Sequence, residues 1–207
     1  MIVLMQKPHF HSVQGLVIIM SIIVIDVNNM NTNQDSKEEK KVEEVPVTVQ
    51  GSECLKRLVP PHDIKSRKVL EGDLDYVAKE AKVLYDICMT GAWAMHHSQI
   101  EADDPMDFYV TRDMKIVINP IITKHSNYTV KHQEGCVSFT NEPWREVDRW
   151  QKCEIEYVSI MVDPNNKDKF KLSSKFEDSL SGMDAFVAQH ETDHGRAKFI
   201  YKIKEEK

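Results

Sequence analysis

Two histidines four residues apart, His190 and His194, enclose a glutamate near the C-terminal end of the chain. On an α-helix, positions i and i+4 lie on one face about 5–6 Å apart, so two imidazole nitrogens could converge on one cation. The intervening Glu191 would then reach a water molecule held by that cation. This spacing is typical of metal-assisted hydrolysis. A solvated helix face can hold the same pattern by chance, so the deciding question is the third ligand.

A catalytic metal site of this kind needs three protein ligands and one open position for water. No histidine follows His194, and the downstream acids Glu205 and Glu206 lie in a charged tail. Residues 195–200 also lack the third histidine of the long metzincin motif. We therefore expect the third ligand to come from the upstream part of the chain.

The four cysteines contain no CxxC pair, so they indicate neither a closed zinc knuckle nor a redox dithiol. Cys54 and Cys88 fall in segments with apolar residues typical of helices, and Cys153 falls at an inward position of a strand-like segment. We expect all three to be buried structural thiols, because free cysteine usually behaves as a small hydrophobic residue. Cys136 differs, since it follows a glycine that permits a tight turn and lies close to Glu134, an acid that could orient a side chain.

The segments Glu134–Ser138 and Gln189–His194 resemble the EGCLS and QHExDH motifs of the peptide deformylase family. Three further blocks resemble family segments in the expected order: Ile118–Ile121 (INPxI), Val147–Trp150 (VxR), and Gly182 with Ala185 (GxxA). The similarity spans roughly residues 45–200, and its last two motifs are specific.

The resemblance implies a site and a reaction. The implied metal ligands are Cys136, His190 and His194. The implied metal is Fe(II), with zinc, nickel or cobalt as alternatives that one thiolate and two imidazoles also suit. Glu191 would move the proton from water to the leaving amine. The Gln99 side-chain amide and the Val137 backbone N–H would stabilise the oxyanion.

The implied reaction removes the formyl group from N-formylmethionine at the N-terminus of newly made proteins and releases formate. The expected partner is a formylated peptide or nascent chain, with transient proximity to the ribosome and no direct contact with nucleic acid. The cytoplasm is the expected compartment. Two other functions stay open: a catalytically impaired deformylase-like binding protein, and an HExxH metallopeptidase.

The first motif of the family, GxGLAAPQ, is altered in this chain, where the segment 92–99 keeps only the final glutamine. Ala92 and Ala94 replace glycines, so a backbone that needs a positive φ would be strained there. His96 and His97 replace small residues. Because adjacent side chains point in different directions, we expect polar filling at these two positions rather than a second metal site.

The composition of the 207 residues, 41% hydrophobic, suits one ordinary domain with extensions. The net charge of -6, with lysines interspersed among acids, argues against polyanion binding. Residues 1–29 contain an apolar stretch at 13–27 that predicts a targeting or membrane-anchoring segment, a terminal strand, or a start site placed too early. Residues 30–44 are polar and predict a disordered linker, which leaves a catalytic domain at 45–207.

Apolar periodicity predicts one helix over residues 71–89 and another over 182–201 that contains the metal motif. Three segments rich in Val, Ile, Tyr and Phe predict strands: 108–122, 127–140 and 153–162. Residues 163–166 predict a turn between a strand and a helix. This order favours an α+β fold, with antiparallel β-sheets around a central metal-binding helix that carries HExxH.

Overall fold

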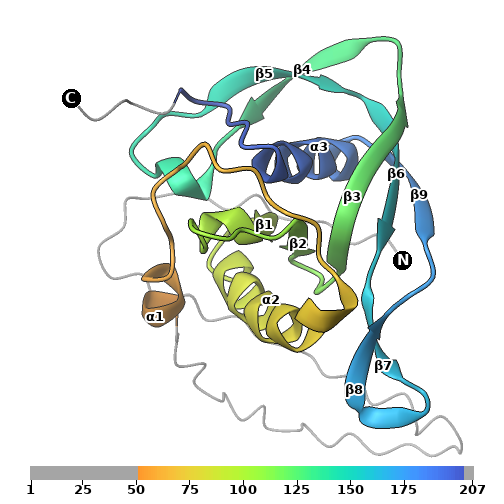
Figure 1. Cartoon of the computed structure of the whole chain (residues 1–207). Helices are drawn as coiled ribbons and strands as arrows, with labels where there is room; N and C mark the ends of the chain where they lie inside the picture. The colour runs from red at the N-terminus through yellow and green to blue at the C-terminus, as the bar shows by residue number, and fades with distance from the viewer. Residues whose placement is uncertain (1–50, 203–207) are drawn as a thin grey trace, which may run out of the picture. The chain divides into compact units, whose positions relative to one another are not determined.

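The computed structural model describes residues 51–202, and the predictions for residues 1–29, for residues 30–44 and for a domain start at residue 45 lie outside that range. Within it, a five-stranded antiparallel sheet has the order β1-β2-β3-β6-β9, and two further strand pairs form ribbons (Figure 1). The sheet strands are β1 (Ala94–His96), β2 (Phe108–Thr111), β3 (Ile116–His125), β6 (Lys152–Val158) and β9 (Phe176–Ser181). The ribbons are β4 (Thr129–Glu134) with β5 (Arg145–Trp150), and β7 (Ile160–Asp163) with β8 (Asn166–Leu172).

Three α-helices and three short 3₁₀ turns complete the described part of the chain. The helices are α1 (Gly51–Leu55), α2 (Leu74–Cys88) and α3 (Met183–Gly195). The 3₁₀ turns are η1 (Glu71–Asp73), η2 (His97–Gln99) and η3 (Val137–Phe139). The predicted α+β class is therefore confirmed, and the His190–His194 motif lies inside α3.

The large sheet lies between α2 and α3. Successive side chains of a strand face opposite sides of the sheet, so alternate residues pack toward each helix. On β2, Phe108 and Val110 join the core formed with α2, whereas Tyr109 lies in the cluster that contains Ala188 of α3. The predicted apolar stripe of α2 is buried, and its fully buried members are Leu74, Val77, Ala81, Leu84 and Cys88. Each face of the sheet thus has its own helix and its own core.

Several boundaries differ from the sequence prediction. The predicted strand at 127–140 ends at Glu134, where the chain turns into η3. The turn at 163–166 joins two strands, β7 and β8, so the prediction of a following helix was wrong. Short charged strands such as β5 and β8 lack the apolar enrichment that marks a strand in a sequence, so the sequence pattern does not predict them.

The largest correction concerns α3, which ends at Gly195 instead of continuing to Tyr201. Ala197 has a φ of 53°, its N–H bonds to the carbonyl of His194, and the N–H of Lys198 bonds to the carbonyl of Asp193. This pair of bonds around a left-handed residue is the Schellman arrangement that ends a helix. The apolar residues beyond it belong to a returning segment, which helical periodicity alone does not reveal.

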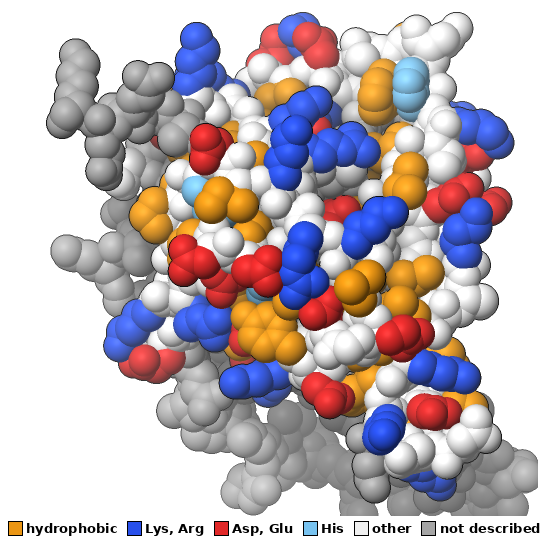
Figure 2. Space-filling model, in the orientation of Figure 1, with side chains coloured by type: hydrophobic (Ala, Val, Ile, Leu, Met, Phe, Trp, Pro, Cys, Tyr) orange, Lys and Arg blue, Asp and Glu red, His pale blue; other side chains and the backbone are white. Residues whose placement is uncertain are grey.

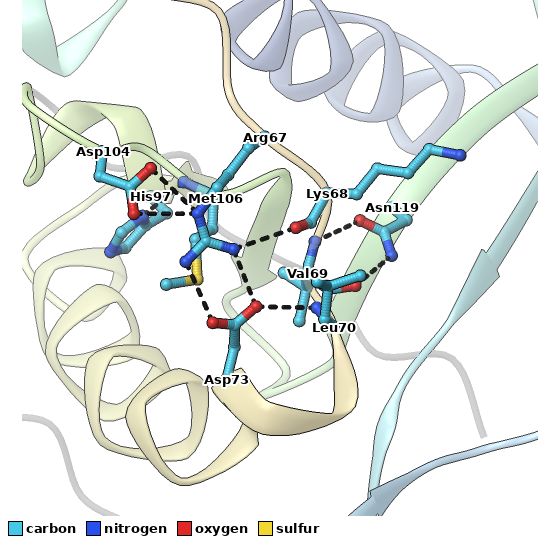
Figure 3. A network of polar contacts seen from close by, with 9 residues as sticks. All are labelled: Arg67, Lys68, Val69, Leu70, Asp73, His97, Asp104, Met106 and Asn119. Atoms are coloured by element: carbon cyan, nitrogen blue, oxygen red, sulfur yellow. Dashed lines mark hydrogen bonds and ion pairs between the residues drawn. The ribbon is translucent and has the colours of Figure 1, made fainter.

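The segment that precedes α2 is held to the sheet by polar contacts (Figure 3). Arg67 bonds to Asp104 through Nε at 2.9 Å and to Asp73 through Nη1 at 2.8 Å. The Asn119 side chain accepts the Val69 N–H at 2.9 Å and donates to the Val69 carbonyl at 3.0 Å. These contacts fix the position at which α2 begins.

Burial agrees with the cysteine prediction at Cys88 and Cys153, whereas Cys54 is only half-buried where α1 packs against the α2 core. On the face shown in Figure 2, basic and acidic side chains are interspersed. None of the helices between residues 51 and 202 combines the length and apolarity that a bilayer crossing requires, and residues 13–27 lie outside that range.

Candidate metal centre and active site

Three side chains from two distant segments meet at one point. Among the described residues, one group of at least three potential ligands could hold a metal ion: Cys136, His190 and His194, whose ligand atoms all lie within 4.8 Å of one another. The two histidines lie on the same face of α3, as their spacing predicts. Cys136 comes from upstream, as expected for the third ligand, and caps η3 directly after β4.

The donor atoms fit a divalent cation. Nε2 of His190 lies 3.1 Å from Nε2 of His194, which in turn lies 3.3 Å from Sγ of Cys136. Because two imidazole lone pairs that face each other at this distance repel, a proton or a metal must lie between them. One thiolate with two imidazoles is a donor set that several borderline divalent metals accept.

A buried ion pair orients His190. Nδ1 of His190 lies 2.9 Å from Glu134 Oε2, so a protonated Nδ1 donates to the carboxylate and leaves Nε2 free for a metal. Glu134 is itself held by Arg149 through two bonds, of 2.7 Å from Nε and 2.9 Å from Nη2. Arg149 also bonds to Asp193 Oδ2 at 2.6 Å, which joins β5 to α3.

The charges in this pair determine its protonation. Burial alone would raise the pKa of Glu134, but hydrogen bonds from Arg149 and His190 outweigh it and lower the pKa to about 2. Burial alone would lower the pKa of His190, yet its hydrogen bonds with Cys136 and Glu134 raise it to about 10. The surroundings of His190 thus favour a positive charge, and a bound cation would benefit from the same field.

Glu191 is a buried carboxyl group whose desolvation is not fully offset by hydrogen bonds. It is 4% exposed, and its Oε2 finds no hydrogen-bond partner among the described residues. Burial raises the pKa of Glu191 to about 7, because desolvation disfavours the charged form. A carboxyl group with a pKa near neutrality can both accept and return a proton at physiological pH.

The Gln99 side chain is oriented by the altered first motif. Its Oε1 accepts the His96 backbone N–H at 2.8 Å, so the amide nitrogen turns the other way. That nitrogen donates to Ser138 Oγ at 3.0 Å and lies 3.8 Å from Cys136 Sγ. Val137 is the first residue of η3, directly after Cys136. Gln99 and Val137 therefore both lie beside the ligand cluster.

The strain expected from the lost glycines does not occur. Ala92 and Ala94 are not among the described residues with positive φ, and Ala94 begins β1, where it pairs with Thr111. His97 is buried, accepts the Met106 N–H at Nδ1 and stacks on Phe108, and neither it nor His96 belongs to the candidate metal group. Nε2 of His97 is buried and finds no hydrogen-bond partner among the described residues, so the ring packs chiefly against apolar neighbours.

Several residues that support the site have no role that their sequence motifs predict. Gln189 accepts the Trp150 N–H and donates to the Trp150 carbonyl, both at 2.9 Å, which fastens α3 to β5. The sequence does not pair Arg149 with Glu134, because the two residues lie 15 positions apart on different strands. The Phe199 ring contacts His194 because the chain turns after Gly195. The predicted helix to residue 201 would not have brought these two side chains together in this way.

The family is decided by a match to the family model for polypeptide deformylase, which covers residues 93–207, more than half of the chain. The chain belongs to the polypeptide deformylase family. A peptide deformylase from Pelagibacter ubique (strain HTCC1062) is 30% identical over 83 residues, which are 40% of this chain and 41% of the relative. The chain thus aligns with about two fifths of that deformylase.

Solved deformylase structures share the fold. The peptide deformylase of Thermotoga maritima superposes with a TM-score of 0.54 at 22% identity, covering 73% of this chain and 90% of that one. Peptide deformylase 1B of Arabidopsis thaliana, solved with an inhibitor, gives 0.56 at 21% identity, with 72% and 81% covered. The deformylase of Vibrio parahaemolyticus bacteriophage VP16T, solved with actinonin, gives 0.54 at 23% identity, with 69% and 95% covered.

Proposed function

We propose that this chain is a metal-dependent hydrolase that removes the formyl group from N-formylmethionine at the N-terminus of newly made proteins. The observation that carries this proposal is the convergence of Cys136, His190 and His194 beside the buried Glu191. Family membership supports the reaction class.

The proposed ligands are the three side chains of that cluster, and Fe(II) is the metal we expect. When bound, a divalent metal supplies Lewis acidity, which activates water and polarises a carbonyl group. Glu134 and Arg149 hold the His190 ring so that Nε2 faces the cluster. His194 presents its own Nε2 to the same point.

Glu191 carries the proton in this proposal. Its carboxylate takes a proton from the attacking water and returns it to the amine nitrogen that leaves. Burial raises the pKa of Glu191, which makes its carboxylate a stronger base toward the attacking water. Burial also excludes other water molecules that would compete for the same proton.

Gln99 and Val137 are the proposed donors to the oxyanion. The Gln99 amide nitrogen faces the cluster because its oxygen is engaged by the His96 N–H. The Val137 backbone N–H follows Cys136 directly in the chain. Donors fixed before the reaction cost no reorganisation when negative charge develops on the carbonyl oxygen.

The experiment is formate release from a formyl-Met peptide by the full chain, loaded with Fe(II) without oxygen. Glu191→Gln should keep the metal and the fold and lose nearly all turnover, and Cys136→Ala should lose both metal and turnover. Cys153→Ala is the matched control, since that buried thiol lies outside the cluster. Equal rates of formate release in Glu191→Gln and the parent would refute the proposed role of Glu191. Metal binding without turnover in the parent would favour a binding role instead.

A further inference from the structure

The two histidines of the cluster are supported differently. His190 has a carboxylate partner on Nδ1, whereas His194 Nδ1 is buried and finds no hydrogen-bond partner among the described residues. Metal-binding histidines nearly always donate this second nitrogen to an oxygen, which fixes the orientation of the ring. Another contact must therefore hold the His194 ring in place.

Rings on neighbouring segments supply such contacts. The Phe199 ring meets His194 edge to face, with centroids 5.1 Å apart and an interplanar angle of 73°. The His96 ring lies nearly parallel to it, with centroids 6.4 Å apart and an angle of 23°. Both distances fall within the range of favourable aromatic pairs.

His96 occupies its place because α3 presents a glycine there. A Cβ on Gly195 would lie 3.0 Å from His96 Nε2 and 2.5 Å from Asp107 Oδ1. His96 Nδ1 accepts the Ser98 N–H at 3.1 Å, so Nε2 carries the proton and points to Asp107 at 3.4 Å. The ring is thus held on both nitrogens while it lies beside His194.

Phe199 is held by the segment that returns after α3. The Tyr201 hydroxyl donates to the Pro143 carbonyl at 2.6 Å, and its ring packs 4.8 Å from that of Phe139. Phe139 also contacts Phe199 at 5.6 Å and belongs to η3, which begins directly after Cys136. Arg145 lies 4.9 Å over the Tyr201 ring. This aromatic cluster of Phe139, Phe199 and Tyr201 therefore joins the segments of two candidate ligands.

We propose that Phe199 and His96 are positioning residues that hold the His194 imidazole by ring packing, in place of the usual hydrogen bond on Nδ1. The inference rests on the proposed function only in taking His194 as a metal ligand. Removing the Phe199 ring leaves His194 with more rotational freedom, so the three donors would no longer converge as closely.

The test is a Co(II) titration of the full chain, followed by visible absorption, which reports affinity and ligand geometry without turnover. Phe199→Ala should weaken Co(II) binding about tenfold to hundredfold, the usual effect of losing an outer partner of a ligand. His96→Ala should weaken it less, because the parallel ring is farther away. Phe199→Tyr keeps the ring, so its Co(II) affinity and spectrum should match those of the parent.

Controls separate positioning from general destabilisation. Phe170→Ala removes a half-exposed ring on the β7–β8 ribbon, away from α3 in Figure 1, and should leave Co(II) binding unchanged. Phe199→Leu keeps apolar volume without a ring and reports the effect if Phe199→Ala does not fold, as judged by circular dichroism and urea unfolding. Parent-like affinity and spectrum in folded Phe199→Ala or Phe199→Leu would overturn the proposal.

The outcomes also separate this proposal from the proposed function. A parent that binds Co(II) but releases no formate would refute the deformylase activity and leave the role of Phe199 to be decided by the titration. A parent that binds no Co(II) would refute the ligand set on which both depend.

Discussion

Two arginines each bridge two carboxylates in this molecule, in very different surroundings. Arg149 joins Glu134 to Asp193 beside the metal cluster, and its side chain is 7% exposed. Arg67 joins Asp73 to Asp104 ahead of α2, and its side chain is 38% exposed (Figure 3). The N–O distances are similar in the two networks, so they do not distinguish them.

Burial distinguishes them. Water screens the charges around Arg67, whereas the surroundings of Arg149 strengthen both the attraction within its network and the penalty for an unpaired charge. The Arg67 hydrogen bonds also lower the pKa of Asp73, but Asp73 and Arg67 can return to water when separated. Glu134 cannot do so, because its side chain is 6% exposed. The buried ion pair therefore fixes the geometry of the site, whereas the exposed pairs of Arg67 add a modest contribution to stability.

The largest effect should come from Arg149→Met. Glu134 would remain buried without its main partner, so we expect the free energy of unfolding to fall by about 3–5 kcal/mol, as for other broken buried pairs. Urea denaturation of the parent, of Arg149→Met and of the double variant Arg149→Met/Glu134→Gln measures this loss of stability. The double variant should recover part of the loss because it removes the stranded charge. A loss below about 1 kcal/mol would place Arg149 with the surface pairs.

Arg67→Met should have a smaller effect, about 1 kcal/mol, because exposed pairs contribute little. Leu70 still donates its N–H to Asp73 at 2.8 Å, so the carboxylate keeps a partner. Urea unfolding in low salt and in about 1 M NaCl, where the Debye length is near 3 Å, should show this loss shrinking with salt. The loss in Arg149→Met should persist. A salt-insensitive effect at Arg67 would contradict the distinction.

The smallest effect is the pH dependence of Asp73. Its folded pKa is lowered, chiefly by the hydrogen bond from Arg67, so its contribution to stability is present above the unfolded pKa of about 3.9. That contribution is lost as the pH falls through the folded pKa. The stability difference between the parent and Asp73→Asn should therefore be at most about 1 kcal/mol at pH 7 and should shrink below pH of about 4. A difference that grows in acid would reverse the assigned sign.

Local patterns in the sequence predicted much of the scaffold. The apolar spacing from Leu74 to Cys88 gives the buried face of α2, because that rhythm matches the helical period. The inward position of Cys153 follows from strand alternation. The end of α3 at Gly195 could not be read in this way, because apolar residues at helical spacing continue to Tyr201. The hydrogen bonds around Ala197, not the spacing, end the helix.

The four-residue spacing of His190 and His194 is enough to predict that they share one face, since i and i+4 are neighbours on any helix. How each ring is held depends on contacts between distant parts of the fold. Glu134 reaches His190 through strand pairing with β5, and Phe199 reaches His194 because the chain reverses after α3. Such contacts join residues far apart in the chain or beyond a turn, and their geometry depends on the packing of the whole domain rather than on any local period.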